Sequence, residues 1–475
     1  MGSLEYVPAD GPASKVPHIE RLAAWSAGLQ YDDLPAPVIE MTKDFFLDWY
    51  ACALGGRNHA SVQAITAFSK DMGRVGGRGS EILHEPGTTI GSAFAALING
   101  AASHVIEQDD LHNSSMMHPA TVVFPAALAV AQEVGADGKA FITACVAGYD
   151  VACRVGEFLG PGHYAKFHTT ATAGVFGATA AAAHLLRLNG AQTLSALGTA
   201  GTQAAGLWQF MLDATHSKQV HTAKACFDGV FSAHVARAGL LGPRDILQGA
   251  NGMAASMVPA GSAVRPEAIV AGLGNGDADG FAIMASSFKW HASCRHTHAS
   301  VDALLQIMRE HGLVLDDVAA VVCHTYRAAV EILSRSEAGL TVHQSKFSMG
   351  FVLAVAAKYG RASVLDFTEA ALDDAELRAF QQRVRMVVDG PIEAAFPAQW
   401  QARVDVTTKA GATYTAFVPI AKGDPGRHLT RSELETKALR IAEYAGVADM
   451  GAVKDNIERA WHLEDVKDLS GFACI

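Results

Sequence analysis

The sequence predicts a mainly α-helical protein in which a smaller α+β lid domain is inserted into a large all-helical domain. Before about residue 270, apolar side chains recur at helical spacing and no segment shows convincing strand alternation. Strand patterns then occur, and helical spacing resumes after a loop at residues 422–426. We therefore expect a helical domain over residues 1–284, a lid domain over 285–420, and C-terminal helices over 421–475 that return to the helical domain.

The helical part begins with amphipathic segments, since Leu22, Trp25 and Leu29 share one helical face. Pro35 and Pro37 mark the next helix start. Later segments are rich in Ala and Gly, and small side chains let helices pack closely. These expected helices cover residues 88–104, 138–156, 171–188, 191–209 and 224–239.

The predicted lid combines strands with helices. Alternating β-branched and polar residues predict strands at 318–325, 383–389, 402–407 and 414–419. A Lys-Ala-Gly-Ala turn at 409–412 joins the last two strands, and helices are expected at 299–310 and 346–357. Glycines 272, 274 and 276 are not followed by a helix, so they predict a loop and not a dinucleotide site.

Composition narrows the function. Half of the 475 residues are apolar, 18% are charged, and the net charge is −11. A chain of this kind folds into large cores, and no Lys/Arg run predicts nucleic-acid binding. Seven scattered cysteines without a C-x-x-C pattern are typical of a reducing compartment. The sequence shows no signal-peptide pattern and no apolar run long enough for a membrane span, so we expect a cytoplasmic protein without nucleic-acid or membrane partners.

Ionisable side chains concentrate between two apolar segments, in the stretch 104–118. Burial and mutual charge move the pKa values of such groups towards neutrality, as acid–base catalysis requires. The stretch predicts an enzyme that moves protons on a small polycarboxylate without metal or cofactor. Its ionisable residues are three carboxylates, Glu107, Asp109 and Asp110, and three imidazoles, His104, His112 and His118.

Each of these residues also has a structural interpretation. His118 precedes Pro119 and is either a proton carrier or a core or capping imidazole. Asp109 and Asp110 are equally compatible with capping the following helix. His168 precedes a helix, whose N-terminus would attract a substrate carboxylate, or whose first threonines would simply cap it.

A second group of potential ligands occurs at His291, Cys294, His296 and His298. Their spacing does not match common structural zinc patterns, and no second ligand cluster follows. We therefore expect no metal there, and interpret the segment as a pocket wall or helix start at the domain junction.

Six motifs along the chain form a recognisable series. They are A-A-L-I-N-G at 95–100, E-Q-D-D-L-H from Glu107 with H-P-A from His118, F-H-T-T-A at 167–171, Ser217-Lys218, F-K at 288–289, and Lys346-Phe347-Ser348. Together they resemble the MmgE/PrpD family, along nearly the whole chain and in order. The resemblance implies a helical domain with a smaller lid, a homodimer, and cofactor-free chemistry on di- or tricarboxylates. Family members include 2-methylcitrate dehydratase, cis-aconitate decarboxylase and iminodisuccinate epimerase.

The resemblance also implies site residues. Glu107 stands where the family has an aspartate, and Leu111 where a threonine is common; both departures bear on the substrate. The catalytic set that we predict is Glu107, Asp110, His118 and His168. The predicted substrate-binding residues are His112, Lys218, Lys289 and Tyr326.

These residues favour a lyase in which lysines hold the substrate carboxylates and stabilise the charge left when a proton leaves carbon. Dehydration of a 2-methylcitrate-like acid is our first prediction, since it is the family's commonest activity. Epimerisation of a dicarboxylate and decarboxylation of cis-aconitate are the enzymatic alternatives. A catalytically silent sensor that binds a polycarboxylate is the non-enzymatic alternative, motivated by Glu107 and Leu111.

Overall fold

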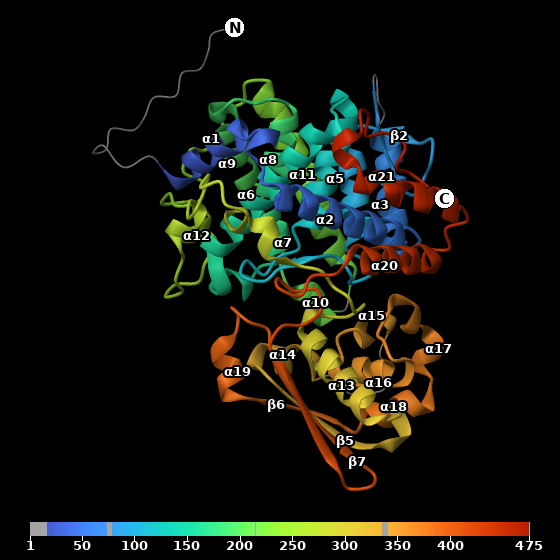
Figure 1. The fold of residues 1–475 in the computed structure, drawn as a ribbon. Helices are drawn as coiled ribbons and strands as arrows, with labels where there is room; N and C mark the ends of the chain where they lie inside the picture. Colours follow the sequence, from blue (N-terminus) through green and yellow to red (C-terminus); the bar gives the residue numbers. More distant parts are fainter. Residues whose placement is uncertain (1–16, 74–77, 214, 335–340, 475) are drawn as a thin grey trace.

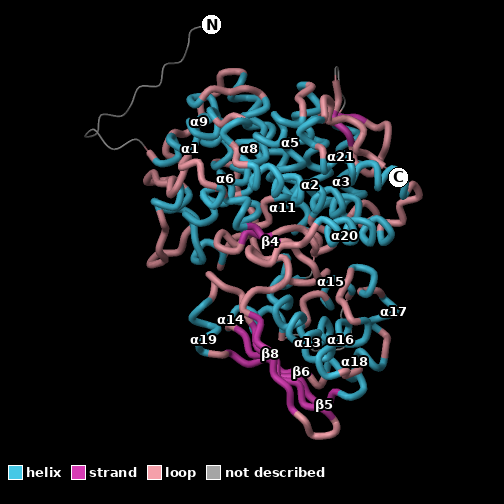
Figure 2. Tube along the Cα trace, viewed as in Figure 1, coloured by secondary structure: helices cyan, strands magenta, loops and turns pink. Residues whose placement is uncertain are grey.

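A larger helical body lies above a smaller body that holds the main sheet (Figure 1). The computed structural model describes residues 17–73, 78–213, 215–334 and 341–474. Helices dominate both bodies and strands gather in the smaller one (Figure 2), which confirms the mainly α fold. Within the described residues, no helix is both long enough and apolar enough to cross a membrane.

Twelve helices form the first part of the described chain, and two pairs of two-residue strands lie between or just after them. The strands are β1 (Ser80–Glu81) with β2 (Thr89–Ile90), and β3 (Leu111–His112) with β4 (Ser286–Ser287). The helices are α1 (His18–Gly28), α2 (Ala36–Gly55), α3 (Ala60–Met72), α4 (Ser92–Ser103), α5 (Ala120–Val134), α6 (Gly138–Tyr164), α7 (Thr169–Thr172), α8 (Gly174–Leu185), α9 (Gly190–Gly201), α10 (Gln209–Asp213), α11 (Ser217–Arg237) and α12 (Met253–Met257).

Small residues let the central helices pack closely. Helix α8 is buried along almost its whole length and packs against α5, α6 and α11. Where it meets α6, a side chain at Gly177 would come within 2.7 Å of the carbonyl oxygen of Gly148. Glycine is therefore needed at this contact, and the Ala/Gly-rich composition read from the sequence has a direct packing reason.

The smaller body contains a four-stranded sheet with strand order β6-β5-β7-β8. Strands β5 and β6 are parallel, whereas β5 with β7 and β7 with β8 are antiparallel. The four predicted strands are confirmed to within one or two residues at each end. The elements are α13 (His298–His311), β5 (Val318–Thr325), α14 (Arg327–Leu333), α15 (Val342–Ser345), α16 (Met349–Tyr359), α17 (Glu369–Leu372), α18 (Ala375–Gln381), β6 (Val384–Val388), α19 (Gly390–Ala395), β7 (Ala402–Thr408) and β8 (Thr413–Val418).

The last two helices, α20 (Arg431–Tyr444) and α21 (Met450–Trp461), lie against α2 in the helical body (Figure 1). A capping box between Thr430 and Glu433 starts α20. Its Lys437 is buried and forms an ion pair with Asp48 of α2. The chain thus enters the smaller body near residue 288 and leaves it near residue 423.

The two crossing segments are tied together and to the helical body. The backbone N–H of Phe288 donates to the carbonyl oxygen of Gly423 at 2.8 Å. The Phe288 ring stacks on Phe45 of α2 with 4.0 Å between ring centroids. This anchoring fixes Lys289, the next residue, at the junction of the two bodies.

Several helix boundaries differ from the sequence prediction: α6 continues to Tyr164 instead of ending at 156, and α11 begins at Ser217 instead of 224. The helix expected over 171–188 is preceded by the separate short helix α7, and α9 ends at Gly201, eight residues before the expected end. The helix expected from Lys346 begins at Met349, because the Ser348 hydroxyl accepts the backbone N–H of Phe351 and caps it there. Side-chain caps and turns set these boundaries, which apolar periodicity does not locate.

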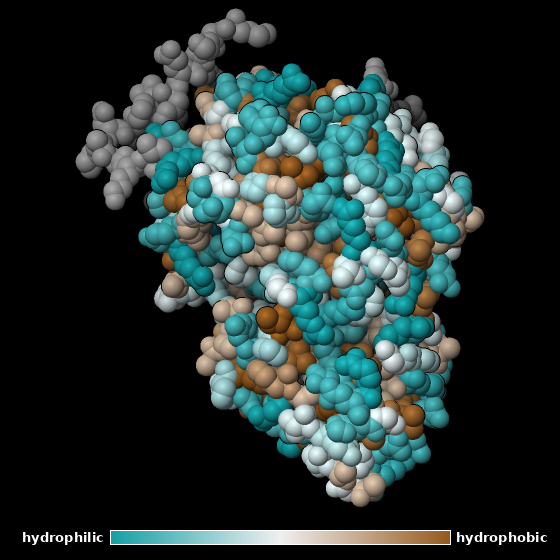
Figure 3. All heavy atoms as spheres, in the orientation of Figure 1, coloured by the Kyte–Doolittle hydropathy of each residue, from teal (hydrophilic) through white to brown (hydrophobic). Residues whose placement is uncertain are grey.

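Hydrophilic side chains cover most of the face drawn in Figure 3, where apolar side chains show only in scattered groups. The residues predicted to carry the chemistry are mostly buried.

Candidate active site

Glu107 lies in the loop after α4 and has a left-handed backbone, with φ at 61°. Non-glycine residues seldom take this conformation, because Cβ crowds the backbone. The carboxylate is buried between two lysines. Lys218, in the first turn of α11, binds one of its oxygens, and Nζ of Lys289 lies 3.5 Å from the other. Two ammonium groups from distant segments therefore converge on one strained residue.

The lysines determine the charge state of Glu107. Burial raises the pKa of a carboxyl group, but Lys218 and Lys289 together lower the pKa of Glu107 below its ordinary value. Burial lowers the pKa of Lys289, whereas Glu107 and Asp109 raise it, and the net shift is upward. Glu107 and Lys289 are therefore ionised at neutral pH, and the two lysines share a single carboxylate.

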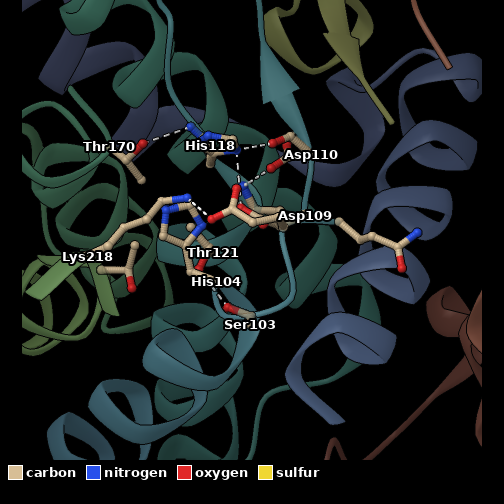
Figure 4. A network of polar contacts seen from close by, with 12 residues as sticks. Ser103, His104, Asp109, Asp110, His118, Thr121, Thr170 and Lys218 are labelled. Atoms are coloured by element: carbon tan, nitrogen blue, oxygen red, sulfur yellow. Dashed lines mark hydrogen bonds and ion pairs between the residues drawn. The ribbon is translucent and has the colours of Figure 1, made fainter. Parts of the chain in front are cut away.

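Asp109 stands between two imidazoles (Figure 4). Its Oδ2 is 2.6 Å from Nδ1 of His104 and 3.2 Å from Nδ1 of His118. Nδ1 of His118 also bonds to the carbonyl oxygen of Asp110. Both of these partners are acceptors, so Nδ1 of His118 carries a proton, and the neutral ring keeps Nε2 as its basic nitrogen. The His118 side chain is 14% exposed, while those of His104 and Asp109 are fully buried.

Burial also sets the charge of these groups. It lowers the pKa of His118, although Asp109 opposes the shift, and it lowers the pKa of His104 to about 3. Burial alone would raise the pKa of Asp109, but His104 and His118 bring it well below its usual range. An ionised carboxylate next to neutral imidazoles is the arrangement of a general base held in one orientation.

Asp110 points to a different set of partners. Its Oδ1 accepts the backbone N–H of Ala120 at 3.0 Å, and its Oδ2 accepts the Tyr149 hydroxyl at 2.9 Å. Burial, with Asp109 adding to it, raises the pKa of Asp110 well above its ordinary value. Its Oδ1 holds the start of α5, as the capping interpretation expects, and its Oδ2 is held by Tyr149 of α6. Asp109 is the acid that meets the imidazoles.

His168 joins the cluster from the segment before α7. Its ring stacks on His104 with 5.6 Å between centroids, and its Nδ1 is 3.2 Å from Nδ1 of His221. The following helix has only four residues, too few for the anion-binding N-terminus that we expected. The Thr170 hydroxyl instead accepts the backbone N–H of His118 at 3.1 Å and fixes that residue.

His112, a predicted substrate-binding residue, lies on β3. Its Nδ1 is 2.9 Å from the Ser115 hydroxyl. It lines a pocket of about 640 Å³ together with Arg154 and Glu157, and these two charges also act on its pKa, which burial lowers. In the described part of the chain, no hydrogen bond links its side chain to Glu107 or Asp109.

Tyr326 is buried in the smaller body, where its ring stacks on Phe396 with 4.2 Å between centroids. Its hydroxyl is 2.7 Å from Nδ1 of His296. Burial lowers the pKa of His296 to about 3, and Arg295 and Lys289 add to this shift. Tyr326 is therefore linked to the Glu107 cluster only indirectly within the described residues. Its hydroxyl contacts His296, whose pKa Lys289 helps to lower, and Lys289 contacts Glu107.

Three residues of the cluster are absent from the predicted set: His104, Asp109 and Lys346. The first two lie in the stretch 104–118, but sequence alone did not say which of its acids faces the imidazoles. Lys346 follows α15, and its Nζ donates to the carbonyl oxygen of Ile106 at 2.9 Å. The signal that could have pointed to Lys346 was its place in the motif Lys346-Phe347-Ser348, which resembles the family.

His104, Asp109 and His118 also bring three potential metal-ligand atoms within 4.8 Å of one another. Lys218 and Lys289 both act to lower the pKa of His118, and the same repulsion opposes a cation at this position. The absence of a metal requirement stays a prediction. The segment 291–298 offers no such group within the described residues, since His291 pairs with Asp302 and His296 with Tyr326.

Comparison with known proteins identifies the family. The model of the MmgE/PrpD N-terminal domain matches residues 20–264, and that of the MmgE/PrpD C-terminal domain matches residues 291–463. The chain belongs to the MmgE/PrpD family. The family prediction made from the motifs is therefore confirmed.

Several curated proteins resemble this MmgE/PrpD chain. It is 27% identical to the cis-aconitate decarboxylase-like protein oryM of Aspergillus oryzae, over 94% of this chain and 95% of that protein. It is 24% identical to human cis-aconitate decarboxylase, over 95% and 92% of the two chains. It is 28% identical to cis-aconitate decarboxylase of Aspergillus terreus, over 62% and 60%. These findings support a lyase-type enzyme of the MmgE/PrpD family.

Proposed function

We propose that this protein is a lyase that decarboxylates a small unsaturated tricarboxylate of the cis-aconitate type without a cofactor. The relatives that span most of both chains carry the name of this activity. The observation that carries the proposal is the buried meeting of Glu107 and two lysines with the Asp109–imidazole group. Dehydration, the first choice from sequence, is retained as a rival outcome of the test.

The lysines supply the binding step. Lys218 and Lys289 share one carboxylate, so a substrate carboxylate can take up the unmatched positive charge. The buried ammonium of Lys346 adds positive charge near Glu107, but its Nζ is bonded to the carbonyl oxygen of Ile106 and is not counted among the substrate ligands; burial lowers its pKa to about 8. A substrate with two or three carboxylates meets this requirement better than a monoacid.

The chemical step needs charge stabilisation and one proton. The bond between carbon and one carboxylate breaks, and carbon dioxide leaves. The electron pair stays on the conjugated carbon chain and spreads to a remaining carboxylate, whose negative charge the lysines stabilise. A proton then returns to carbon from an imidazole. His118 is the best placed to donate it, because it is the more exposed of the two imidazoles that contact Asp109.

The substrate itself prepares His118 for this role. Burial lowers the pKa of the His118 imidazole and so favours its neutral form. A polyanion placed beside it raises its pKa, because opposite charge favours the protonated ring. Asp109 at 3.2 Å stabilises the imidazolium that forms. Substrate binding and proton uptake are thus coupled.

We also propose that the protein is a homodimer, as the family resemblance implies. Helices α3 and α11 border an apolar surface groove lined by Ile65, Phe68 and Phe227. Phe68 is 56% exposed and Met72, at the end of α3, is 63% exposed. Exposed apolar groups of this kind are typical of protein interfaces. Light scattering of the wild type and of Phe68→Glu tests this, and a monomeric wild type would contradict it.

The function is tested by incubating the protein with cis-aconitate, 2-methylcitrate, citrate and iminodisuccinate in D2O. We expect carbon dioxide release from cis-aconitate and one deuterium on a carbon of the product by NMR, unchanged by a chelator. Water loss from 2-methylcitrate without carbon dioxide release would favour the dehydratase instead. Calorimetric binding of an acid without any exchange or turnover would indicate a sensor.

A further inference from the structure

The two carbonyl groups that flank Glu107 are each held by a buried lysine. Nζ of Lys346 donates to the oxygen of Ile106 at 2.9 Å. Nζ of Lys437 donates to the oxygen of Gln108 at 2.7 Å. These lysines are 4% and 3% exposed. Neither touches the Glu107 carboxylate within the described residues, where Lys218 and Lys289 bind it.

The held carbonyls lie on either side of a residue with φ at 61°. A left-handed glutamate is disfavoured and persists only where its surroundings hold it. Relaxation to negative φ would turn the neighbouring peptide planes and swing the carboxylate away from Lys218 and Lys289. The Lys346 bond opposes that rotation directly, because the Ile106 carbonyl belongs to the peptide plane that adjoins the φ bond of Glu107. The Lys437 bond fixes the plane between Gln108 and Asp109, one residue further along.

The two lysines come from different parts of the molecule. Lys437 belongs to α20 and is also paired with Asp48 of α2, so it is part of the helical body. Lys346 follows α15, which Figure 1 places on the edge of the smaller body that faces the helical body. In the described part of the chain, the carbonyl oxygen of Ile106 is the one hydrogen-bond acceptor of the Lys346 ammonium. This bond therefore links the smaller body to the backbone of the Glu107 loop.

We propose that Lys346 is a positioning residue that holds Glu107 in its left-handed conformation and so makes the catalytic geometry depend on the docking of the smaller body. The effect on turnover rests on the proposed function; the effect on the backbone does not. A rival role for Lys346 is direct binding of a substrate carboxylate. The two roles differ in what they change, since lost positioning lowers kcat and lost binding raises KM.

The test compares K346M with K43M in the full-length protein. Lys43 is a matched control, because it is also buried and its Nζ also donates to a backbone carbonyl, that of Trp461 at 3.1 Å, far from Glu107 in the chain. Hydrogen exchange followed by mass spectrometry on peptides covering residues 104–112 reports the backbone in the absence of substrate. Steady-state kinetics on the acid that the D2O experiment identifies as the substrate gives kcat and KM separately.

For K346M we expect faster exchange in the 104–112 peptides, a fall in kcat of about 10²-fold and little change in KM, because small displacements of catalytic groups cost this much. K43M should leave the exchange of the 104–112 peptides, kcat and KM as in the wild type. Should K346M fail to fold, K346Q replaces it, because the glutamine amide donates a hydrogen bond without a charge; it should show smaller changes of the same sign.

Unaltered exchange in the folded variants would overturn the proposal, and so would a rise in KM at constant kcat. If the wild type turns over no acid, the proposed function fails while the exchange comparison still decides whether Lys346 holds the backbone. The failure of one idea is therefore distinguishable from the failure of the other.

Discussion

Two segments of this protein are equally rich in potential catalytic and ligand side chains, and only one gathers them. Residues 104–118 bring His104, Asp109 and His118 together around shared contacts. Residues 289–298 send their imidazoles to separate partners: His291 to Asp302, and His296 to Tyr326. Composition is thus a poor guide to whether side chains meet.

The backbone explains the difference. The first segment reverses direction, with left-handed residues at Glu107 and Met116 and a bridge between His112 and Met117. The side chains at 109 and 118, five and fourteen positions after His104, therefore both reach its ring. The second segment runs from the crossing into a 3₁₀ turn at 295–297 and then into α13, so that successive side chains point in different directions.

The strongest test of this contrast is His118→Ala in the first segment. We expect kcat to fall by roughly 10²–10⁴-fold, the usual contribution of a general acid or base. The thermal midpoint should change less than for a fully buried ring, because the His118 side chain is 14% exposed. Steady-state kinetics and a melting curve on the same preparation measure both effects.

His298→Ala is the matched change in the second segment. The ring is fully buried, and its Nε2 lies 3.4 Å from the carbonyl oxygen of Ser293. We expect a loss of about 1–3 kcal/mol in the free energy of unfolding, with kcat close to that of the wild type. A larger kcat loss for His298→Ala than for His118→Ala would reverse the assignment of the two segments.

Acid should destabilise both segments alike. Burial lowers the pKa of His104 in the first segment and of His296 in the second to about 3. In the unfolded chain these imidazoles titrate near 6.5, so between these values the unfolded state binds more protons. Stability is therefore full above about pH 6.5 and falls as pH decreases, by about 1.4 kcal/mol per pH unit for each imidazole.

Urea unfolding at several pH values measures this slope. His104→Gln and His296→Gln should each flatten the acid limb by the contribution of one proton, since glutamine does not titrate. A slope between pH 6 and 4 that neither variant alters would show that these rings are not buried as neutral imidazoles.

Sequence predicted the fold well because most of its signals are local. Alternation located β5 through β8, and small residues marked α4, α6, α8 and α11. Hairpin residues 409–412 and the glycine loop at 272–276 also occur as expected. The errors lie at helix ends, such as Gly201 and Ser348, where a turn or a single side-chain cap decides the boundary.

The site was predicted less completely, because it depends on long-range contacts. Glu107, Lys218 and Lys289 meet as the resemblance implied, from positions 111 and 182 residues from Glu107. Local pattern could not decide between Asp109 and Asp110, because the choice follows from the chain reversal at Glu107. Lys346 acts on a backbone carbonyl 240 positions away, and no local pattern reports such a contact.

Tyr326→Phe tests whether His296 of the second segment supports catalysis by the residues of the first segment. Removing the hydroxyl leaves Nδ1 of His296 without its partner at 2.7 Å. We expect kcat/KM to fall by about 10-fold, through displacement of His296 near Lys289 and not through lost acid–base chemistry. The pH dependence of kcat should keep its shape, and a shifted limb would instead make Tyr326 a proton carrier.

His112→Ala should have the smallest effect on catalysis, although His112 lies in the same stretch as His118. Its partner is the Ser115 hydroxyl, and the pocket that it lines with Arg154 and Glu157 is separate from the contacts of Glu107 and Asp109. We therefore expect kcat and KM to stay within about threefold of the wild type, as for a residue outside the catalytic unit. The measurement is steady-state kinetics beside His118→Ala. A loss comparable to that of His118→Ala would mean that the substrate reaches β3, and that the site extends to the side of the loop that faces Arg154.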